Sequence, residues 1–255
     1  MVRPPFADAG ATELALSIQT RVVYVVHGFN VDRPSGHESL FAFAQRLASR
    51  TPDAAYVAVT WPGHSWAGPA SYPLEGNDAD DSAVELARFI DRVHPAGTEL
   101  SFVTHSLGAR VVLGAVRRLA PGRYPLTEVC TMAAAVDDFS VSIPSAYRAE
   151  VERAGRVAVL ASERDAVLRL AYPLGDFLQS FLFFWKDVPG LALGYHGPRA
   201  APNRPIPANV RHTQIPRAVG AGHGDYLFSG TPNARQARAA AFAAAVVARD
   251  AAPEY

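Results

Sequence analysis

The chain has 255 residues, and a composition with 49% hydrophobic and 19% charged residues excludes an intrinsically disordered protein. Lys and Arg together number 24, the same as Asp and Glu, so the net charge is zero and nothing suggests a nucleic-acid-binding protein. The single cysteine, Cys130, cannot form an intramolecular disulfide. The sequence contains no run of about 18 apolar residues, so no membrane-spanning helix is predicted. Residues 1–10 lack the apolar core of a secretory signal, so we expect a cytoplasmic protein.

Strand-like and helix-like segments alternate along the chain, which predicts an α/β protein: a mostly parallel central sheet with helices on both faces. The strand candidates are runs of apolar and β-branched residues, as expected for strands that are covered on both sides. In chain order they are residues 22–26, 55–61, 100–103, 129–136, 157–161 and 208–215.

Helices are predicted between these strands from the spacing of their apolar residues. Two of them begin at a serine followed three residues later by a glutamate, the pattern of a capping box. The predicted helices run from Ser35 to Ala48, from Ser82 to Val93, from Ala109 to Leu119 and from Ala237 to Ala248.

The late part of the chain fits this alternation poorly. Residues 177–185 are almost entirely apolar, and residues 188–207 are rich in proline and glycine, which predicts an irregular excursion. No linker divides the chain, so we expect a single domain over residues 1–255 with an insertion at about 170–207. That insertion would form a cap or lid, and its proline-rich part at residues 188–207 would be a lid, a dimer arm or an inert loop.

The segment Thr104-His105-Ser106-Leu107-Gly108 lies between a predicted buried strand and a predicted helix. This is the context of a nucleophile elbow, in which a sharp turn exposes the serine at the carboxyl edge of the sheet. The N-terminus of the following helix offers unpaired N–H groups and a partial positive charge to an oxyanion. The alternative is a serine in an ordinary turn between a strand and a helix.

The first strand ends in His27-Gly28-Phe29-Asn30. A glycine at this point lets the chain turn so that the next N–H group points across the strand ends toward Ser106. The N–H groups of Phe29 and Leu107 are therefore the expected oxyanion hole.

Together these motifs resemble the α/β-hydrolase superfamily. More narrowly, the chain is similar to a bacterial group of uncharacterised α/β hydrolases with H-G-F-N after the first core strand and W-P after the second, here Trp61-Pro62. The resemblance implies an eight-stranded, mostly parallel sheet and a catalytic triad in the chain order serine, acid, histidine. One position departs from the usual G-x-S-x-G elbow, because Thr104 replaces the first glycine.

The resemblance also implies the other members of the triad. Asp165, in the loop after the fifth strand, matches the usual acid, with Asp137 and Asp138 after the preceding strand as alternatives. His223, on the glycine-rich loop before the last helix, matches the base. Ser106 would then form an acyl-enzyme that water hydrolyses, without a metal or other cofactor.

The substrate is predicted only broadly, as a small-molecule or lipid ester, and hydrolysis by an esterase or lipase-like enzyme is the first hypothesis. An acyltransferase or thioesterase with the same triad, or a non-catalytic protein that binds a partner or membrane through residues 177–185, are the alternatives. That apolar segment would line an acyl pocket or contact a lipid surface without spanning it, or else form a core helix. The oligomeric state is left open. The residues expected to contact the substrate are His27, Gly28, Trp61, His105, Phe181 and Trp185.

Overall fold

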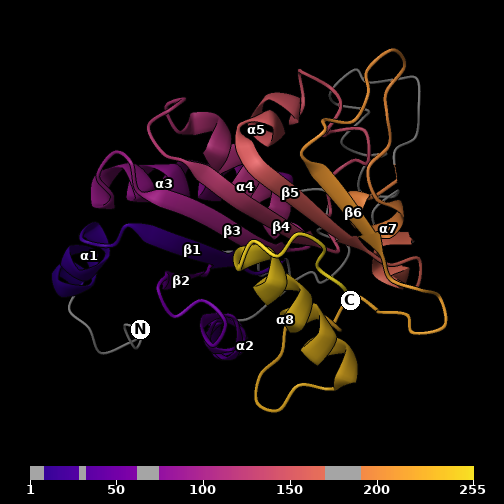
Figure 1. Ribbon diagram of the computed structural model, residues 1–255, viewed down its shortest axis with the longest axis horizontal. Helices are drawn as coiled ribbons and strands as arrows, with labels where there is room; N and C mark the ends of the chain where they lie inside the picture. Colours follow the sequence, from indigo (N-terminus) through magenta and orange to yellow (C-terminus); the bar gives the residue numbers. More distant parts are fainter. Residues whose placement is uncertain (1–8, 29–32, 62–74, 170–190) are drawn as a thin grey trace.

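The computed structural model describes residues 9–28, 33–61, 75–169 and 191–255, and its centre is a parallel sheet (Figure 1). Six strands pair in the order β2-β1-β3-β4-β5-β6, and every neighbouring pair is parallel. The strands are β1 (Arg21–Val26), β2 (Ala55–Val59), β3 (Glu99–His105), β4 (Leu126–Met132), β5 (Ala154–Ala161) and β6 (Val210–Gln214). All six predicted strands are thus confirmed, with shifts of a few residues at their ends.

Helices cover both faces of this sheet, as predicted. One face carries α2 and α8, which pack on each other, and the other carries α3, α4 and α5 (Figure 1). The helices are α1 (Ala9–Ser17), α2 (Arg33–Ala48), α3 (Glu75–Val93), α4 (Gly108–Arg118), α5 (Arg148–Glu152), α7 (Leu193–His196) and α8 (Ala234–Val247).

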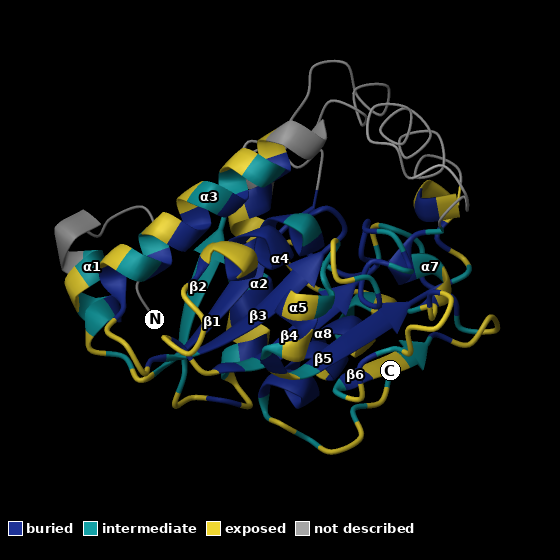
Figure 2. Cartoon of the chain, turned by 90° about the horizontal axis from the view of Figure 1, so that it is seen from above, coloured by how far each residue is buried: buried dark blue, intermediate teal, exposed yellow. Residues whose placement is uncertain are grey.

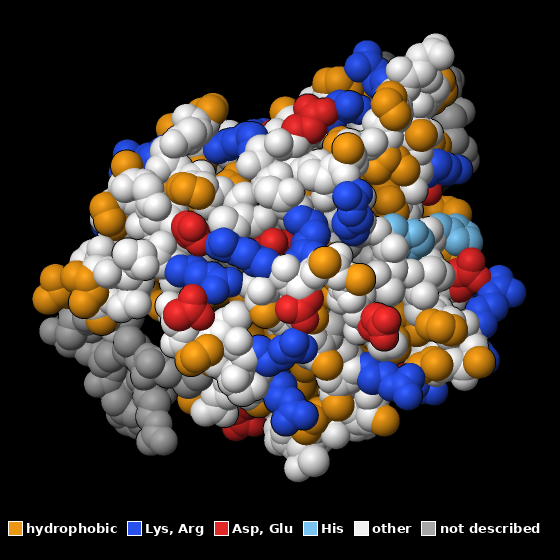
Figure 3. Space-filling model, viewed as in Figure 1, with side chains coloured by type: hydrophobic (Ala, Val, Ile, Leu, Met, Phe, Trp, Pro, Cys, Tyr) orange, Lys and Arg blue, Asp and Glu red, His pale blue; other side chains and the backbone are white. Residues whose placement is uncertain are grey.

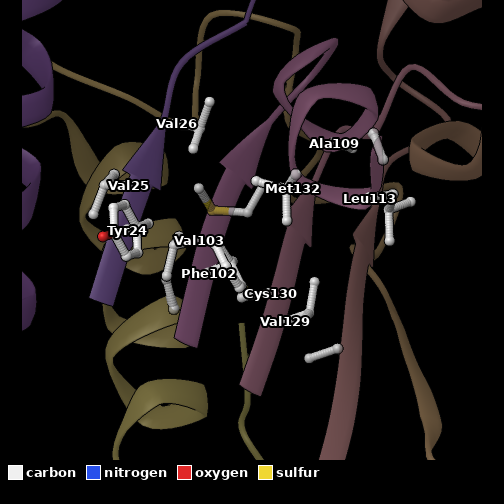
Figure 4. Close-up of a cluster of buried hydrophobic side chains, with 14 of the residues drawn as sticks. Tyr24, Val25, Val26, Phe102, Val103, Ala109, Leu113, Val129, Cys130 and Met132 are labelled. Atoms are coloured by element: carbon white, nitrogen blue, oxygen red, sulfur yellow. The ribbon is translucent and has the colours of Figure 1, made fainter. Parts of the chain in front are cut away.

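The core lies along the central strands, which appear as continuous dark blue ribbons in Figure 2. Residues 22–26 of β1 are all fully buried, because helices cover both faces of the strand. Each such apolar side chain contributes roughly 1.5–3 kcal/mol by its removal from water. Figure 4 shows how side chains from β1, β3, β4 and α4 meet in one cluster, which includes Cys130. Burial raises the pKa of the Cys130 thiol, so this side chain is an inert core residue.

All four predicted helices begin earlier in the structure; α4 starts at Gly108 instead of Ala109, and α8 at Ala234 instead of Ala237. α2 starts at Arg33 and α3 at Glu75, so the serines of both expected capping boxes, Ser35 and Ser82, lie inside helices. In α3 the buried face already begins at Ala79, and Figure 2 shows buried and exposed residues alternating along the helix. The extension ahead of Ser82 thus buries Ala79, and it also brings Asp80 into a paired contact with Arg110 of α4.

The expectation of eight strands differs from the described part of the chain, which contains six. Before β1 the chain forms a helix, α1, that packs against α3, so residues 9–17 add no strand to the sheet. Within the described residues, no helix is both long enough and apolar enough to cross a membrane. On the face seen in Figure 3, basic and acidic side chains are interspersed, in keeping with the zero net charge.

Candidate active site

Ser106 follows β3 directly and has a left-handed backbone conformation, with φ of +54°. This conformation is uncommon for a residue with a side chain and is maintained only where the surroundings enforce it. Here the Ser106 N–H donates to the Met132 carbonyl at 3.0 Å, and the Ser106 carbonyl accepts from Ala135 N–H at 3.1 Å. The end of β4 and the residues that follow it therefore hold the turn in place.

Two glycines allow the chain to approach this turn closely. A Cβ atom at Gly28 would lie 2.6 Å from Ser106 Cβ, and one at Gly108 would lie 2.6 Å from the His27 carbonyl oxygen. Because both distances are far below van der Waals contact, neither position accommodates a side chain without displacing the backbone. The loop after β1 and the start of α4 are thus packed against each other around Ser106.

For the ester hydrolysis that the sequence predicts, this packing leads us to expect that Gly28→Ala lowers kcat at least about 10²-fold, because displacement of the Ser106 side chain by about 1 Å would have an effect of that size. The measurement is steady-state hydrolysis of p-nitrophenyl esters. Gly224→Ala is the matched control, since a Cβ atom there meets no atom within 4 Å. Equal activity of the two variants would contradict the close contact between Gly28 and Ser106.

Three side chains from distant loops form a hydrogen-bonded chain at the carboxyl edge of the sheet. His223 Nε2 lies 2.9 Å from Ser106 Oγ, and His223 Nδ1 lies 2.8 Å from Asp165 Oδ2. Asp165 is fully buried, and its other carboxylate oxygen accepts from Leu168 N–H at 3.0 Å. A carboxylate at Nδ1 selects the tautomer with a proton on that nitrogen, which leaves Nε2 free to accept the serine proton.

The expected oxyanion donors are only partly within the described residues. Leu107 is the N-cap residue of α4, and its N–H group donates to no acceptor in the described part of the chain. That N–H group is adjacent to Ser106, where an oxyanion would form. Phe29, the second expected donor, lies outside the described residues, as do Phe181 and Trp185.

His27 and Trp61 are buried and bonded to each other. Their rings stack with centroids 5.8 Å apart, and the Trp61 indole N–H donates to the His27 carbonyl at 2.9 Å. The backbone N–H of Trp61 donates to His27 Nε2 at 3.3 Å, while His27 Nδ1 lies 2.5 Å from the Gly28 carbonyl. Burial lowers the pKa of His27, which favours the neutral ring that this pattern requires. These contacts connect the segment after β2 to the turn at Gly28.

His105 lies behind the hydrogen-bonded chain rather than in line with it. Its Nε2 donates to the backbone carbonyl of His223 at 2.9 Å, and its ring packs against those of His223 and Tyr226. Burial lowers the pKa of His105 well below its ordinary value, so the ring is neutral beside His223. His105 therefore contacts the backbone of the loop that carries His223.

The alternative acids lie elsewhere. Asp138 is buried and forms an ion pair with Arg199 at 3.0 Å, and Asp137 accepts from Phe139 N–H at 2.8 Å. The carboxylate that contacts His223 is that of Asp165. Within the described residues there is no cluster of three or more His, Cys, Asp or Glu side chains that would bind a metal ion.

Asp137 provides a prediction on stability. Burial and the neighbouring Asp138 carboxyl raise its pKa from 3.8 to about 6. Between pH 3.8 and about 6 the folded protein binds more protons than the unfolded chain. The free energy of unfolding that is linked to Asp137 therefore falls as the pH rises through this range. The rise corresponds to at most about 3 kcal/mol, which solvent screening of a half-buried side chain reduces to about 1–2 kcal/mol.

Asp137→Asn is therefore expected to be more stable than the wild type by about 1–2 kcal/mol at pH 8 and nearly equal to it at pH 4. The amide resembles the protonated carboxyl and keeps the acceptor for Phe139 N–H. Urea denaturation across this range measures the difference. Asp81→Asn, at an exposed position of α3, is the control, and a parallel pH dependence of the two variants would refute the assignment to Asp137.

The sequence prediction missed two residues that lie around Asp165 and His223. Ser162 bonds to the backbone before His223, and Tyr226 packs on His105. Their positions were the only signal in the sequence: Ser162 follows the fifth predicted strand, and Tyr226 lies at the end of the glycine-rich loop.

The chain is similar to one protein family and to several solved structures. A family model described as an alpha/beta hydrolase of unknown function (DUF900) matches residues 8–176, a segment that contains Ser106 and Asp165 and ends before His223. No curated protein matches the chain.

Several solved structures are similar to the chain at low sequence identity. The catalytic core domain of acetyl xylan esterase from Trichoderma reesei is 13% identical, with a TM-score of 0.46 over 90% of this chain and 96% of that one. The dienelactone hydrolase-like promiscuous phosphotriesterase P91 from metagenomic libraries is 12% identical, with a TM-score of 0.48 over 90% and 85%. The Pyrobaculum calidifontis esterase is 16% identical, with a TM-score of 0.44 over 92% and 78%.

Proposed function

The chain belongs to the family of alpha/beta hydrolases of unknown function DUF900, and from this membership we propose that it is a serine-dependent hydrolase of carboxylic esters. The observation that carries the proposal is the chain of hydrogen bonds from Ser106 through His223 to Asp165. Each contact has the length expected between a nucleophile, its base and the group that orients the base.

In this proposal Ser106 Oγ attacks the ester carbonyl while His223 Nε2 takes its proton. Asp165, bonded at Nδ1, keeps the imidazole in the required tautomer and stabilises the imidazolium. His223 then returns the proton to the leaving alcohol, and an acyl-enzyme remains. Water activated by the same histidine attacks the acyl group and releases the acid.

The oxyanion of the tetrahedral intermediate would be stabilised by the Leu107 N–H group at the start of α4. Its lack of an acceptor among the described residues supports this role, and one such preorganised donor contributes about 10²- to 10³-fold in rate. The Phe29 N–H group is proposed as the second donor. The left-handed conformation of Ser106 is typical of a nucleophile elbow, in which the sharp turn exposes the serine side chain at the edge of the sheet.

We propose a small-molecule or lipid ester as the substrate class. The test is intact-mass labelling of the folded protein with a fluorophosphonate, followed by hydrolysis of p-nitrophenyl esters of increasing acyl length. A single adduct and an optimum in acyl length are expected. A folded protein that is neither labelled nor able to hydrolyse any of the esters would refute the proposal.

The proposed role of the acid gives a further prediction. Asp165→Asn is expected to lower kcat about 10⁴-fold with a small change in KM, because an amide at Nδ1 favours the tautomer that cannot accept the serine proton. The matched control is Asp138→Asn, which alters a buried carboxylate paired with Arg199. Steady-state kinetics at pH 8 distinguish them, and a larger loss in Asp138→Asn would transfer the role of the acid to that position.

A further inference from the structure

Ser162 is the first residue after β5 and is fully buried. Its hydroxyl donates to the Ala221 carbonyl at 2.7 Å and accepts from the Ala221 N–H at 3.1 Å and from the Arg164 N–H at 3.2 Å. A serine hydroxyl has one donor and two acceptor sites, so its hydrogen-bonding capacity is fully used. All three of these partners are backbone groups.

These bonds connect the two loops that carry the proposed acid and base. Ser162 lies three residues before Asp165, and its carbonyl accepts from the Asp165 N–H at 3.1 Å, closing the turn that presents the carboxylate. Ala221 lies two residues before His223. The Ser162 hydroxyl therefore fixes the distance between the two loops, at a point near the contact between Asp165 and His223.

The loop that carries His223 is held from the opposite side as well. His105, the residue before Ser106, donates to the His223 carbonyl at 2.9 Å. The backbone around His223 is thus bonded at Ala221 to the acid loop and at His223 to the nucleophile turn. The direct bond between Asp165 and His223 spans the same two loops as the bonds of Ser162.

We propose that Ser162 is a positioning residue that acts through the backbone of Ala221 to place His223 between Asp165 and Ser106. The inference rests on the proposed ester hydrolysis. Ser162 touches no reacting group, so its effect is on the alignment of the base, where a shift of about 1 Å lowers the rate about 10²-fold. Side chains that form a site depend on such supporting hydrogen bonds for their geometry.

The test is Ser162→Ala, with kcat expected to fall about 10²-fold while KM changes less than about 2-fold. The rate of labelling by a fluorophosphonate should fall in parallel. Ser162→Thr keeps the hydroxyl and is expected to recover most of kcat. Such a recovery would show that the fall in Ser162→Ala comes from the lost hydrogen bonds and not from the lost side-chain volume.

Ser142 provides a matched control. It is also fully buried, and its hydroxyl lies 2.8 and 3.2 Å from the carbonyl oxygens of Phe139 and Arg199, which share its one proton, while it accepts from Ala201 N–H at 3.0 Å. Ser142→Ala removes an equivalent set of backbone bonds from a segment without proposed catalytic residues. It should lose comparable stability and keep the wild-type kcat.

Ser162→Cys is the second variant, for use if the alanine variant does not fold, because the thiol fills the space with weaker hydrogen bonds. It is compared with Ser142→Cys at equal folded fraction. Equal kcat in the two members of either pair overturns the positioning role.

The wild type distinguishes this failure from that of the proposed function. If wild-type labelling and hydrolysis depend on Ser106 and the Ser162 variants match their controls, the positioning inference alone is wrong. If the wild type is neither labelled nor active, the proposed function is wrong, and the positioning role is withdrawn with it.

Discussion

Replacement of Ser106 by alanine is expected to lower kcat for p-nitrophenyl ester hydrolysis about 10⁶-fold and to abolish labelling by a fluorophosphonate. The substitution removes Oγ, the only atom of Ser106 that contacts His223 Nε2, and keeps Cβ, which lies against Gly28. The turn, the oxyanion donors and the binding surface should all persist. The rate that remains would therefore measure the hydrolysis that binding and oxyanion stabilisation support without a nucleophile.

The matched control is Ser140→Ala. Ser140 is buried, and its hydroxyl has no hydrogen-bond partner in the described part of the chain. Loss of that hydroxyl should leave kcat unchanged. Substantial labelling of the Ser106→Ala variant, or activity above about 1% of the wild type, would show that another residue is the nucleophile.

The sheet was predictable because its strands are buried on both faces. The run at residues 22–26 contains only apolar, β-branched and aromatic residues, and such a run between turn signals has few alternatives. α1 was not predicted, because its nine residues contain only two large apolar side chains and no clear apolar stripe: Leu16 is buried and Leu14 is exposed. Where α2 and α3 begin was also mispredicted, and in α3 the burial of Ala79 and the pairing of Asp80 with Arg110 lie ahead of the local capping signal at Ser82.

The members of the candidate site could be identified from the order of motifs along the chain, but their contacts could not. Sequence left Asp165, Asp137 and Asp138 as acids, and the choice depends on which carboxylate the fold brings to His223. The pairing of Asp138 with Arg199 joins residues that no local pattern relates. The bond from His105 to the His223 carbonyl likewise depends on how the loops after β3 and β6 meet.

Replacement of His223 by alanine is the second large effect that we expect, with a fall in kcat of about 10⁶-fold near neutral pH. A serine hydroxyl is too weakly acidic to attack an ester without a base, and Nε2 of His223 is the base within 2.9 Å of Ser106 Oγ. In this variant hydroxide has to remove the proton. The residual rate should therefore rise in proportion to the hydroxide concentration, whereas the wild-type rate should not.

His212→Ala is the matched control, because His212 lies exposed on β6 and its ring bonds to the side chain of Gln214. Its kcat and its pH profile should equal those of the wild type. A His223→Ala variant that keeps the wild-type pH profile at a moderately reduced rate would contradict the role of general base. A residual rate proportional to the hydroxide concentration in a folded variant, by contrast, would assign proton transfer to His223, because Asp165 and Ser106 remain in place.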